Sequence, residues 1–252
     1  MAWPWAIPLG LLIGAVLGAI GGGGAILTVP ALIYIFGQGA GAATTGALII
    51  VGLTSLVGVI PHQRDGNVRW REGLTFALLG IAGAAAGSIA SVRVPDAVLT
   101  AAFSVLMLVV AAVMLRRLRG TRPDPQRKGW LAVIATATAV GLLTGFFGVG
   151  GGFAIVPALT LVLGFSMPAA VGTSLLVISI NAATALGTRL LGGTGGLDWP
   201  LLLAFSVTAA AGSLLGARVG KRLGPRVLTI SFAVLMIAVG LLMAAGSIPE
   251  LL

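Results

Sequence analysis

Long apolar runs, separated by short polar segments, recur from one end of the sequence to the other. Stretches of 18 or more apolar residues with few charges are typical of transmembrane helices, and the apolar–polar alternation of membrane β-barrels is absent from the sequence. Because the bilayer core holds no water, each segment must satisfy its own backbone groups, which favours helices. The pattern predicts an all-α polytopic membrane protein with about eight hydrophobic segments, at 5–36, 43–61, 73–92, 97–115, 130–164, 168–190, 199–217 and 226–247.

The composition supports a lipid-covered surface. Hydrophobic residues make up 58% of the chain and charged residues 8%, whereas a water-soluble domain carries about 25% charged residues. The sequence has no cysteine and a single histidine, His62, so we expect no disulfide, metal site or cofactor. The net charge of +9 comes from basic residues in short loops between apolar spans, which indicates membrane orientation and not nucleic-acid binding. His62 follows Pro61 at a predicted helix end, and we interpret it as a solvated residue.

The sequence repeats itself at an offset of about 127 residues. GGGGAILTVPAL at 21–32 corresponds to GVGGGFAIVPAL at 148–159, with the last four residues identical, and AAAGS occurs at 84–88 and 209–213. Internal repeats are characteristic of secondary transporters. The chain is accordingly divided into a first transmembrane repeat (1–115), a basic cytoplasmic linker (116–129) and a second transmembrane repeat (130–252).

The first apolar stretch of each half is too long for one simple span and contains several glycines, so it is either a broken helix or a re-entrant hairpin. Lys and Arg favour cytoplasmic loops. If both stretches enter and return, loops 62–72, 116–129 and 218–226 share one side and hold 13 of the 15 Lys and Arg, with Arg93 and Arg189 opposite. If every stretch crosses once, the division is 10 to 5. The first arrangement is favoured. It predicts inverted repeats of three crossings each, in a cell inner membrane, with both termini periplasmic.

The glycine clusters are candidate binding elements. A half-helix that begins after a glycine break points free N–H groups and its positive dipole end into the membrane interior, and two such ends form an anion site without a charged side chain. Tight helix packing is the competing role, and we assign it to Gly10, Gly14 and Gly18 at four-residue spacing. The candidate substrate-binding glycines are Gly22, Gly23, Gly24, Gly150, Gly151 and Gly152.

Polar residues in the stretch that follows each glycine-rich element are the second set of candidates. Such hydroxyls either bond to their own helix or line a cavity, and an amide inside a span needs a partner. Arg189 lies near the outer end of its span, where it either attracts an anionic substrate or anchors the helix at the interface. The candidates of this set are Thr44, Thr45, Thr173, Ser174, Asn181 and Arg189.

The acidic residues exclude some functions. All six lie in loops or at span ends, whereas a cation transporter normally keeps a carboxylate within the membrane. This pattern favours an anionic or neutral solute. The spans also hold no nucleophile–histidine or paired-aspartate constellation, so an enzyme is not expected.

The duplicated glycine-rich elements ending in Val-Pro-Ala-Leu, together with AAVGTSL at 169–175, resemble the TauE/SafE family of sulfite exporters and membrane transporter proteins. The first half departs from this pattern, with Thr44-Thr45-Gly46 in place of Gly-Thr-Ser. The resemblance implies secondary export of sulfite or organosulfonates by alternating access. The expected partners are a small anion and the lipid bilayer, with a possible homodimer through the glycine faces at 83–87 and 212–216. A passive anion channel or facilitator and a non-transporting membrane scaffold are the alternatives.

Overall fold

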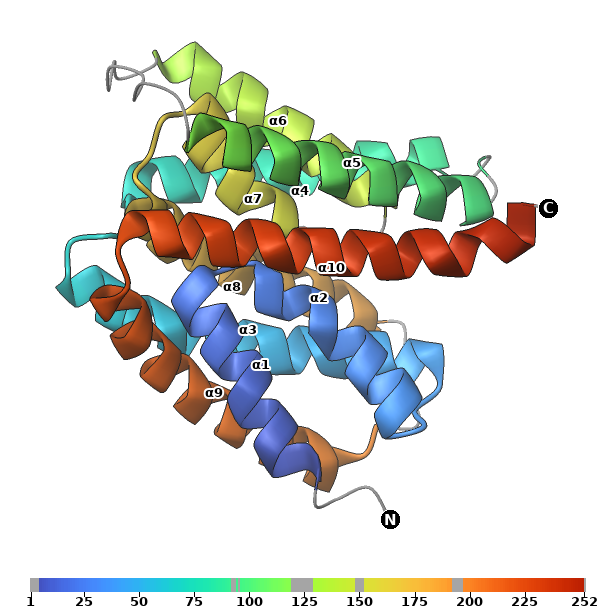
Figure 1. Cartoon of the computed structure of the whole chain (residues 1–252). Coiled ribbons are helices and arrows are strands. Elements are labelled where there is room, and N and C mark those ends of the chain that lie inside the picture. The colour runs from blue at the N-terminus through green and yellow to red at the C-terminus, as the bar shows by residue number, and fades with distance from the viewer. Residues whose placement is uncertain are drawn as a thin grey trace.

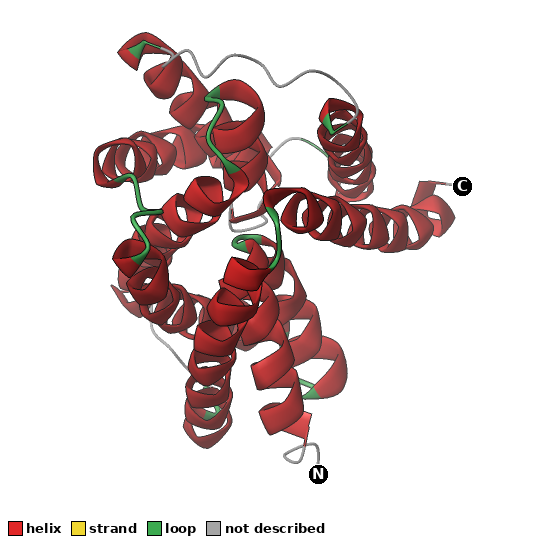
Figure 2. Cartoon of the chain, turned by 60° about the vertical axis from the view of Figure 1, so that its left-hand side comes forward, coloured by secondary structure: helices red, strands yellow, loops and turns green. Residues whose placement is uncertain are grey.

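The structure is a computed structural model that describes residues 5–91, 94, 96–118, 129–147, 152–191 and 197–251 (Figure 1). Over these residues the chain is built of helices joined by short loops, without a strand (Figure 2), so the all-helical prediction is confirmed. The helices of the first half are α1 (Ala6–Ile20), α2 (Gly23–Pro30), the π-helix η2 (Ala31–Ile35), α3 (Ala40–Arg64), α4 (Trp70–Ser91) and α5 (Asp96–Arg117). Those of the second half are α6 (Trp130–Phe147), α7 (Gly152–Pro157), the π-helix η3 (Ala158–Val162), α8 (Met167–Leu191), α9 (Trp199–Arg222) and α10 (Pro225–Leu251).

Five of the described helices contain a segment that is long and apolar enough to cross a membrane. These segments are Gly41–Arg64, Trp130–Phe147, Met167–Gly187, Trp199–Arg222 and Pro225–Ala244. The prediction of a polytopic helical membrane protein is therefore confirmed in this coarser form.

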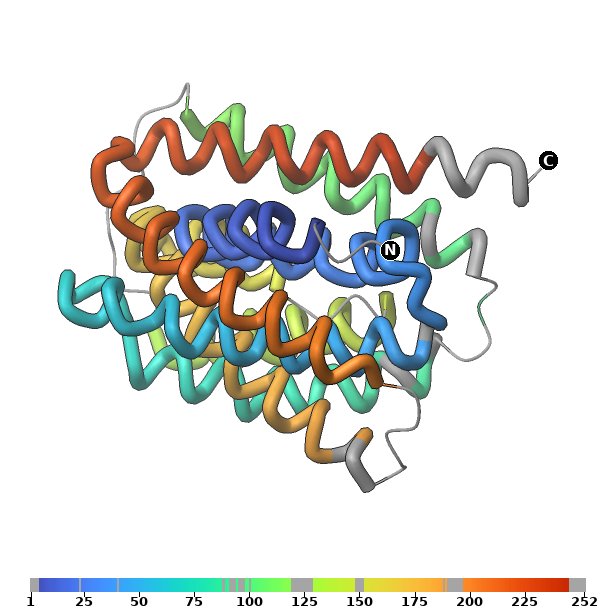
Figure 3. The backbone as a smooth tube through the Cα atoms, turned by 90° about the horizontal axis from the view of Figure 1, so that it is seen from below, coloured from blue at the N-terminus to red at the C-terminus, as the bar shows by residue number. Residues whose placement is uncertain are grey.

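The first apolar stretch of the chain consists of two helices that reverse direction. α1 ends at Ile20, and Gly21 has φ +80°, a backbone conformation that favours glycine. The N–H of Gly21 donates to the carbonyl oxygen of Leu17 at 2.8 Å, and α2 then runs back from the break (Figures 1 and 3). The 15 residues of α1 rise about 22 Å, less than the roughly 30 Å of a bilayer core. α1 and α2 thus have the form of a short hairpin.

The second helix of each hairpin ends in the same way. α2 and α7 each finish on a proline and continue as a π-helix, in which N–H groups bond to carbonyl oxygens five residues earlier. Seven residues after each proline, Gly37 and Gly164 adopt φ values of +66° and +71° and end the helix. The recurrence of these features places equivalent turns at an offset of 127 residues.

Helices of the first half pack mainly on helices of the second. α1 packs along α9, α4 along α6, α3 along α8 and α5 along α10. Glycines make the α1–α9 contact very close, because a Cβ on Gly14 or on Gly18 would overlap the carbonyl oxygen of Ala209 or Ser213, respectively. The same holds between α6 and α4, where a Cβ on Gly145 would overlap a carbonyl oxygen. The packing role predicted for the glycines at four-residue spacing is confirmed.

α8 is the central helix. Residues 169–179 are buried without interruption, and their mainly apolar side chains suit a helix that is surrounded by protein on every side. α8 contacts α3, α4, α7 and α10. Its residues are therefore the best placed of the chain to form an enclosed site.

Charged contacts bring several helix ends together. Lys221, in the last turn of α9, pairs with Asp65, just after α3, at 2.5 Å. Arg71, in the first turn of α4, lies 4.7 Å from the ring centre of Trp130, the first residue of α6. We call this the basic end of the molecule; it carries Arg64, Arg69, Arg71, Arg218, Lys221, Arg222 and Arg226. The starts of α3 and α9 lie at the opposite end, where the Asp198 side chain caps α9 by accepting from the N–H of Leu201 at 3.1 Å.

Candidate functional site

α3 and α8 run antiparallel, and three predicted site residues meet at one end of the pair. Arg189, in the last turn of α8, donates from Nη1 to Oγ1 of Thr44 at 2.8 Å and of Thr45 at 3.2 Å. Thr44 and Thr45 lie near the start of α3. At the basic end the order is reversed, since a Cβ on Gly172, near the start of α8, would lie 3.0 Å from the Cβ of His62 near the end of α3.

The starts of α2 and α7 touch through their backbones. A Cβ on Gly22 would overlap the carbonyl oxygen of Gly152, and a Cβ on Gly152 would lie 3.2 Å from the carbonyl oxygen of Gly22. Gly23 is the first residue of α2, and Gly24 packs against α1, with a Cβ there only 2.8 Å from the carbonyl oxygen of Ile13. The glycine-rich elements of the two halves therefore meet, as a shared site requires. Gly150 and Gly151 lie outside the described residues.

Thr173 and Ser174 are fully buried at the basic end of α8. The hydroxyl of Thr173 accepts from the backbone N–H of Arg69 at 3.1 Å, which ties α8 to the loop between α3 and α4. The hydroxyl of Ser174 donates to the carbonyl oxygen of Val171 at 2.8 Å and lies beside the break, 2.6 Å from where a Cβ of Gly21 would be. Both hydroxyls thus have protein partners in this conformation.

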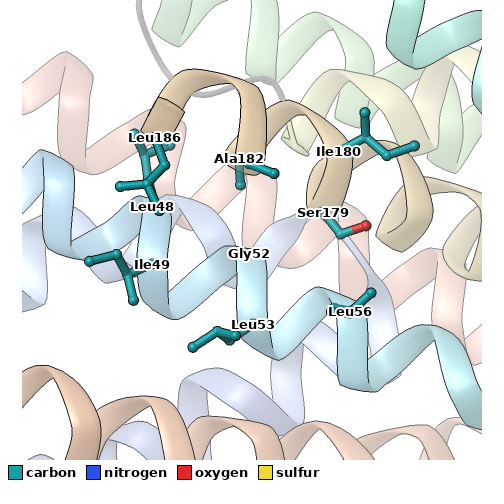
Figure 4. A pocket seen from close by; sticks show the side chains of 10 residues that line it. Leu48, Ile49, Gly52, Leu53, Leu56, Ser179, Ile180, Ala182 and Leu186 are labelled. Atoms are coloured by element: carbon teal, nitrogen blue, oxygen red, sulfur yellow. The ribbon is translucent and has the colours of Figure 1, made fainter. Parts of the chain in front are cut away.

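A cavity of about 400 Å³ lies between α3 and α8 (Figure 4). Its lining is almost entirely apolar, and the hydroxyl of its one polar residue, Ser179, bonds to the carbonyl oxygen of Leu176 on its own helix at 2.8 Å. The lining residues are Leu48, Ile49, Gly52, Leu53, Leu56, Ser179, Ile180, Ala182, Ala183 and Leu186. We call this cavity the α3–α8 groove.

The sequence from residue 6 to residue 243 matches the family described as Sulfite exporter TauE/SafE. This chain belongs to the TauE/SafE family. A probable membrane transporter protein of Xylella fastidiosa is 34% identical over 241 residues, which cover 92% of this chain and 91% of the relative. The probable membrane transporter protein YunE of Bacillus subtilis is 24% identical over 265 residues, 95% of this chain and 96% of the relative. A probable membrane transporter protein of Methanocaldococcus jannaschii is also 24% identical, over 94% of this chain and 95% of its own. No solved structure matches the chain.

The family resemblance seen in the sequence is thereby confirmed, and the TauE/SafE chain is a membrane transporter by family. None of these relatives is named as an enzyme, which fits the absence of a catalytic constellation in the sequence.

His62 is a residue whose role the sequence interpretation missed. It is buried, with 7% of its surface exposed, and its Nε2 lies 2.9 Å from the carbonyl oxygen of Gly18. Gly18 is in the last turn of α1, where helix carbonyls lack partners within the helix. His62 therefore donates to a carbonyl at the broken end of α1, and the interpretation of a solvated histidine is wrong. The repeat offset offered a signal, because 62 plus 127 is the position of Arg189.

Asn181 is the least satisfied of the predicted site residues. Its Oδ1 atom is buried and has no hydrogen-bond partner among the described residues. Its Nδ2 atom lies 3.9 Å from the position that a Cβ of Gly80 on α4 would take. An unpaired buried amide costs about 1–3 kcal/mol. Asn181 thus offers an acceptor lone pair in the interior, between α8 and α4.

Carboxylates are absent from the buried part of the TauE/SafE chain that the structure describes. The buried polar residues are threonines, serines and His62. Asp65 pairs with Lys221 at the basic end, and Asp198 caps α9. The described interior therefore presents N–H and hydroxyl groups without a fixed negative charge, which suits an anion.

Proposed function

We propose that this TauE/SafE protein is a secondary transporter that exports small sulfur-containing anions, sulfite or organosulfonates, by alternating access. The observation that carries the proposal is the contact between the starts of α2 and α7 at Gly22 and Gly152, in a chain whose family is described as a sulfite exporter. Half-helices that begin inside a transporter core point their N–H groups and positive dipole ends at anionic groups.

The proposed mechanism depends on two inverted halves. Three features support them: the hairpin at the start of each half, the matching Pro–π-helix–Gly ends, and the antiparallel contact of α3 with its counterpart α8. The cross-half pairs α1–α9 and α6–α4 are likewise equivalent under exchange of the halves. Inverted repeats allow one half to rock against the other about a fixed substrate site, which opens the site to one side at a time.

The proposed orientation places the basic end in the cytoplasm and both termini outside, in a cell inner membrane. The positive-inside rule supports it, since the ends of α3 and α9 and the start of α4 bring their Lys and Arg together. The chain has no cysteine, so single-cysteine labelling reads the topology directly. Gln63→Cys at the basic end and Gly39→Cys at the opposite end are both exposed positions. An impermeant thiol reagent applied outside should label only the second, and labelling of both would contradict the inversion.

In this proposal the substrate anion accepts hydrogen bonds from backbone N–H groups near the α2–α7 contact and from hydroxyls of α8. Alternating access must then free Thr173 or Ser174 from the bonds they make in this conformation. Arg189 attracts the anion from the outer end. The absence of carboxylates among the described buried residues supports an anionic cargo.

Uptake of labelled sulfite and labelled ethanesulfonate into proteoliposomes tests the proposal. Gly22→Val should abolish uptake of both anions, because the side chain would push α2 away from α7. Gly39→Val is the matched control, since a Cβ at Gly39 meets nothing within 4 Å, and should transport like the wild type. Uptake that survives Gly22→Val in folded protein would contradict the site. A folded wild-type protein that transports neither anion would refute the substrate class.

A further inference from the structure

The α3–α8 groove has an apolar length and a cationic end. Leu48 and Leu186 face each other at one end of the groove, and Leu56 and Ser179 lie at the other (Figure 4). From Leu48 to Leu56 the helix rises about 12 Å. The groove therefore has room for an apolar chain of several carbon atoms.

The cationic end follows from the helix register. Thr45, Ile49, Gly52 and Leu56 are spaced at four, three and four residues, so Thr45 continues the stripe of α3 that lines the groove. On α8, Arg189 follows the lining residues Ala182 and Leu186 at seven and three residues, so it continues the stripe of that helix.

The hydrogen bonds between Arg189 and the two threonines close this end of the groove. The guanidinium bonds Thr44 and Thr45 through Nη1, and a guanidinium carries five N–H donors in a planar fork that matches oxyanions. A cation and two hydroxyls therefore stand directly beyond the last apolar lining residues.

We propose that the α3–α8 groove binds the alkyl tail of an organosulfonate whose sulfonate group is held by Arg189, Thr44 and Thr45. The inference rests on the proposed function and specifies the substrate class: sulfonates that carry an alkyl chain, in preference to bare sulfite. Sulfite has no apolar part and leaves the lining leucines uncovered. An alkyl tail removes them from water while the charged group stays at the cationic end.

The tail length sets the expected affinity. Burial of one methylene stabilises a complex by enough to tighten binding about fourfold. Affinity measured by calorimetry in lipid nanodiscs should therefore rise about fourfold per carbon from methanesulfonate to hexanesulfonate. Empty nanodiscs supply the correction for partition of the longer sulfonates into lipid.

Two alanine substitutions separate the groove from the rest of the surface. Ala183 is exposed and lines the groove, so Ala183→Leu fills it and should remove the dependence on tail length while leaving sulfite binding unchanged. Ala82→Leu, on an exposed position of α4 outside the groove, is the matched control and should keep the full series. Arg189→Gln should weaken all alkanesulfonates by a similar factor.

Equal affinity for methanesulfonate and hexanesulfonate, or a series that persists in Ala183→Leu, would overturn the assignment. A phospholipid that co-purifies with the wild type and is lost in Ala183→Leu would also overturn it, because the groove would then hold a membrane lipid. Sulfite uptake without a tail-length series refutes only the groove, whereas a tail-length series in a protein that transports neither sulfite nor ethanesulfonate refutes the proposed export.

Discussion

The contact between α1 and α9 yields a quantitative prediction, because it joins the two halves through glycine. A Cβ on Gly14 would overlap the carbonyl oxygen of Ala209 and lie 2.6 Å from its carbonyl carbon. These are backbone atoms, so no change of rotamer relieves the overlap and the helices must separate. Overpacking of this kind costs about 1–3 kcal/mol. We therefore expect Gly14→Ala to destabilise the protein by an amount near the upper end of that range.

Gly187→Ala is the matched control for this prediction. Gly187 is also within a helix, but a Cβ there meets nothing within 4 Å. Alanine is favoured over glycine in a helix by about 0.5–1 kcal/mol, so this variant should be as stable as the wild type or more stable. The two variants should therefore differ by roughly 1.5–4 kcal/mol, or about 10- to 1,000-fold in the unfolding equilibrium.

Reversible unfolding in mixed micelles of rising SDS fraction, followed by tryptophan fluorescence, measures this difference; the chain has five tryptophans. Equal stability of Gly14→Ala and Gly187→Ala would refute the close packing of α1 on α9. It would also remove the main contact through which the halves interlock.

Three further predictions concern the site. Gly22→Ala should abolish sulfite uptake, whereas Gly152→Ala should keep most of it, because a Cβ on Gly152 meets no atom closer than 3.2 Å; equal uptake rates would contradict the crossing geometry. His62→Ala should lower the free energy of unfolding by about 1–3 kcal/mol, because the carbonyl of Gly18 loses its donor, and wild-type stability in the SDS assay would argue against that bond. Thr173→Val keeps the side-chain shape but removes an acceptor, so it should cost about 0.5–1.5 kcal/mol and speed amide exchange in peptide 65–70; unchanged exchange would show that the loop is held otherwise.

The broad form of the fold could be predicted from local sequence patterns. The length of the first apolar stretch and its glycines left a broken helix and a hairpin open, and the charge distribution favoured the hairpin. The structure places a positive-φ glycine, Gly21, between α1 and α2. Such features are local, because a span length, a glycine break and a loop charge are each determined within about thirty residues.

The partners of each helix could not be read from the sequence. Gly22 and Gly152 are 130 residues apart, and their contact depends on how ten α-helices pack together, which no local pattern specifies. Periodicity marked Gly14 as a packing residue but did not name α9 as its neighbour. Identification of Ala209 as its partner required the three-dimensional arrangement.

The site residues divide in the same way. Arg189 and Thr45 were both selected as polar residues at the outer ends of spans, and the structure joins them by a hydrogen bond. Thr173 was selected for the same reason but is bonded to the backbone of Arg69 in a loop of the other half. His62 was undervalued, because a histidine beside a predicted loop gives no sign that the end of another helix covers it. Burial of a polar group by a distant segment is the property that sequence reasoning lacks here.

Trans-stimulation is the measurement that tests the central claim, transport of sulfur anions by alternating access, most directly. Proteoliposomes that contain the wild-type protein are preloaded with unlabelled sulfite, and the initial uptake of labelled sulfite is compared with that of empty vesicles. A carrier returns its site faster when it is loaded, so preloading should raise the initial rate several-fold, and Gly22→Val should remove the effect. An uptake rate that is independent of preloading would contradict alternating access and indicate a passive anion pathway.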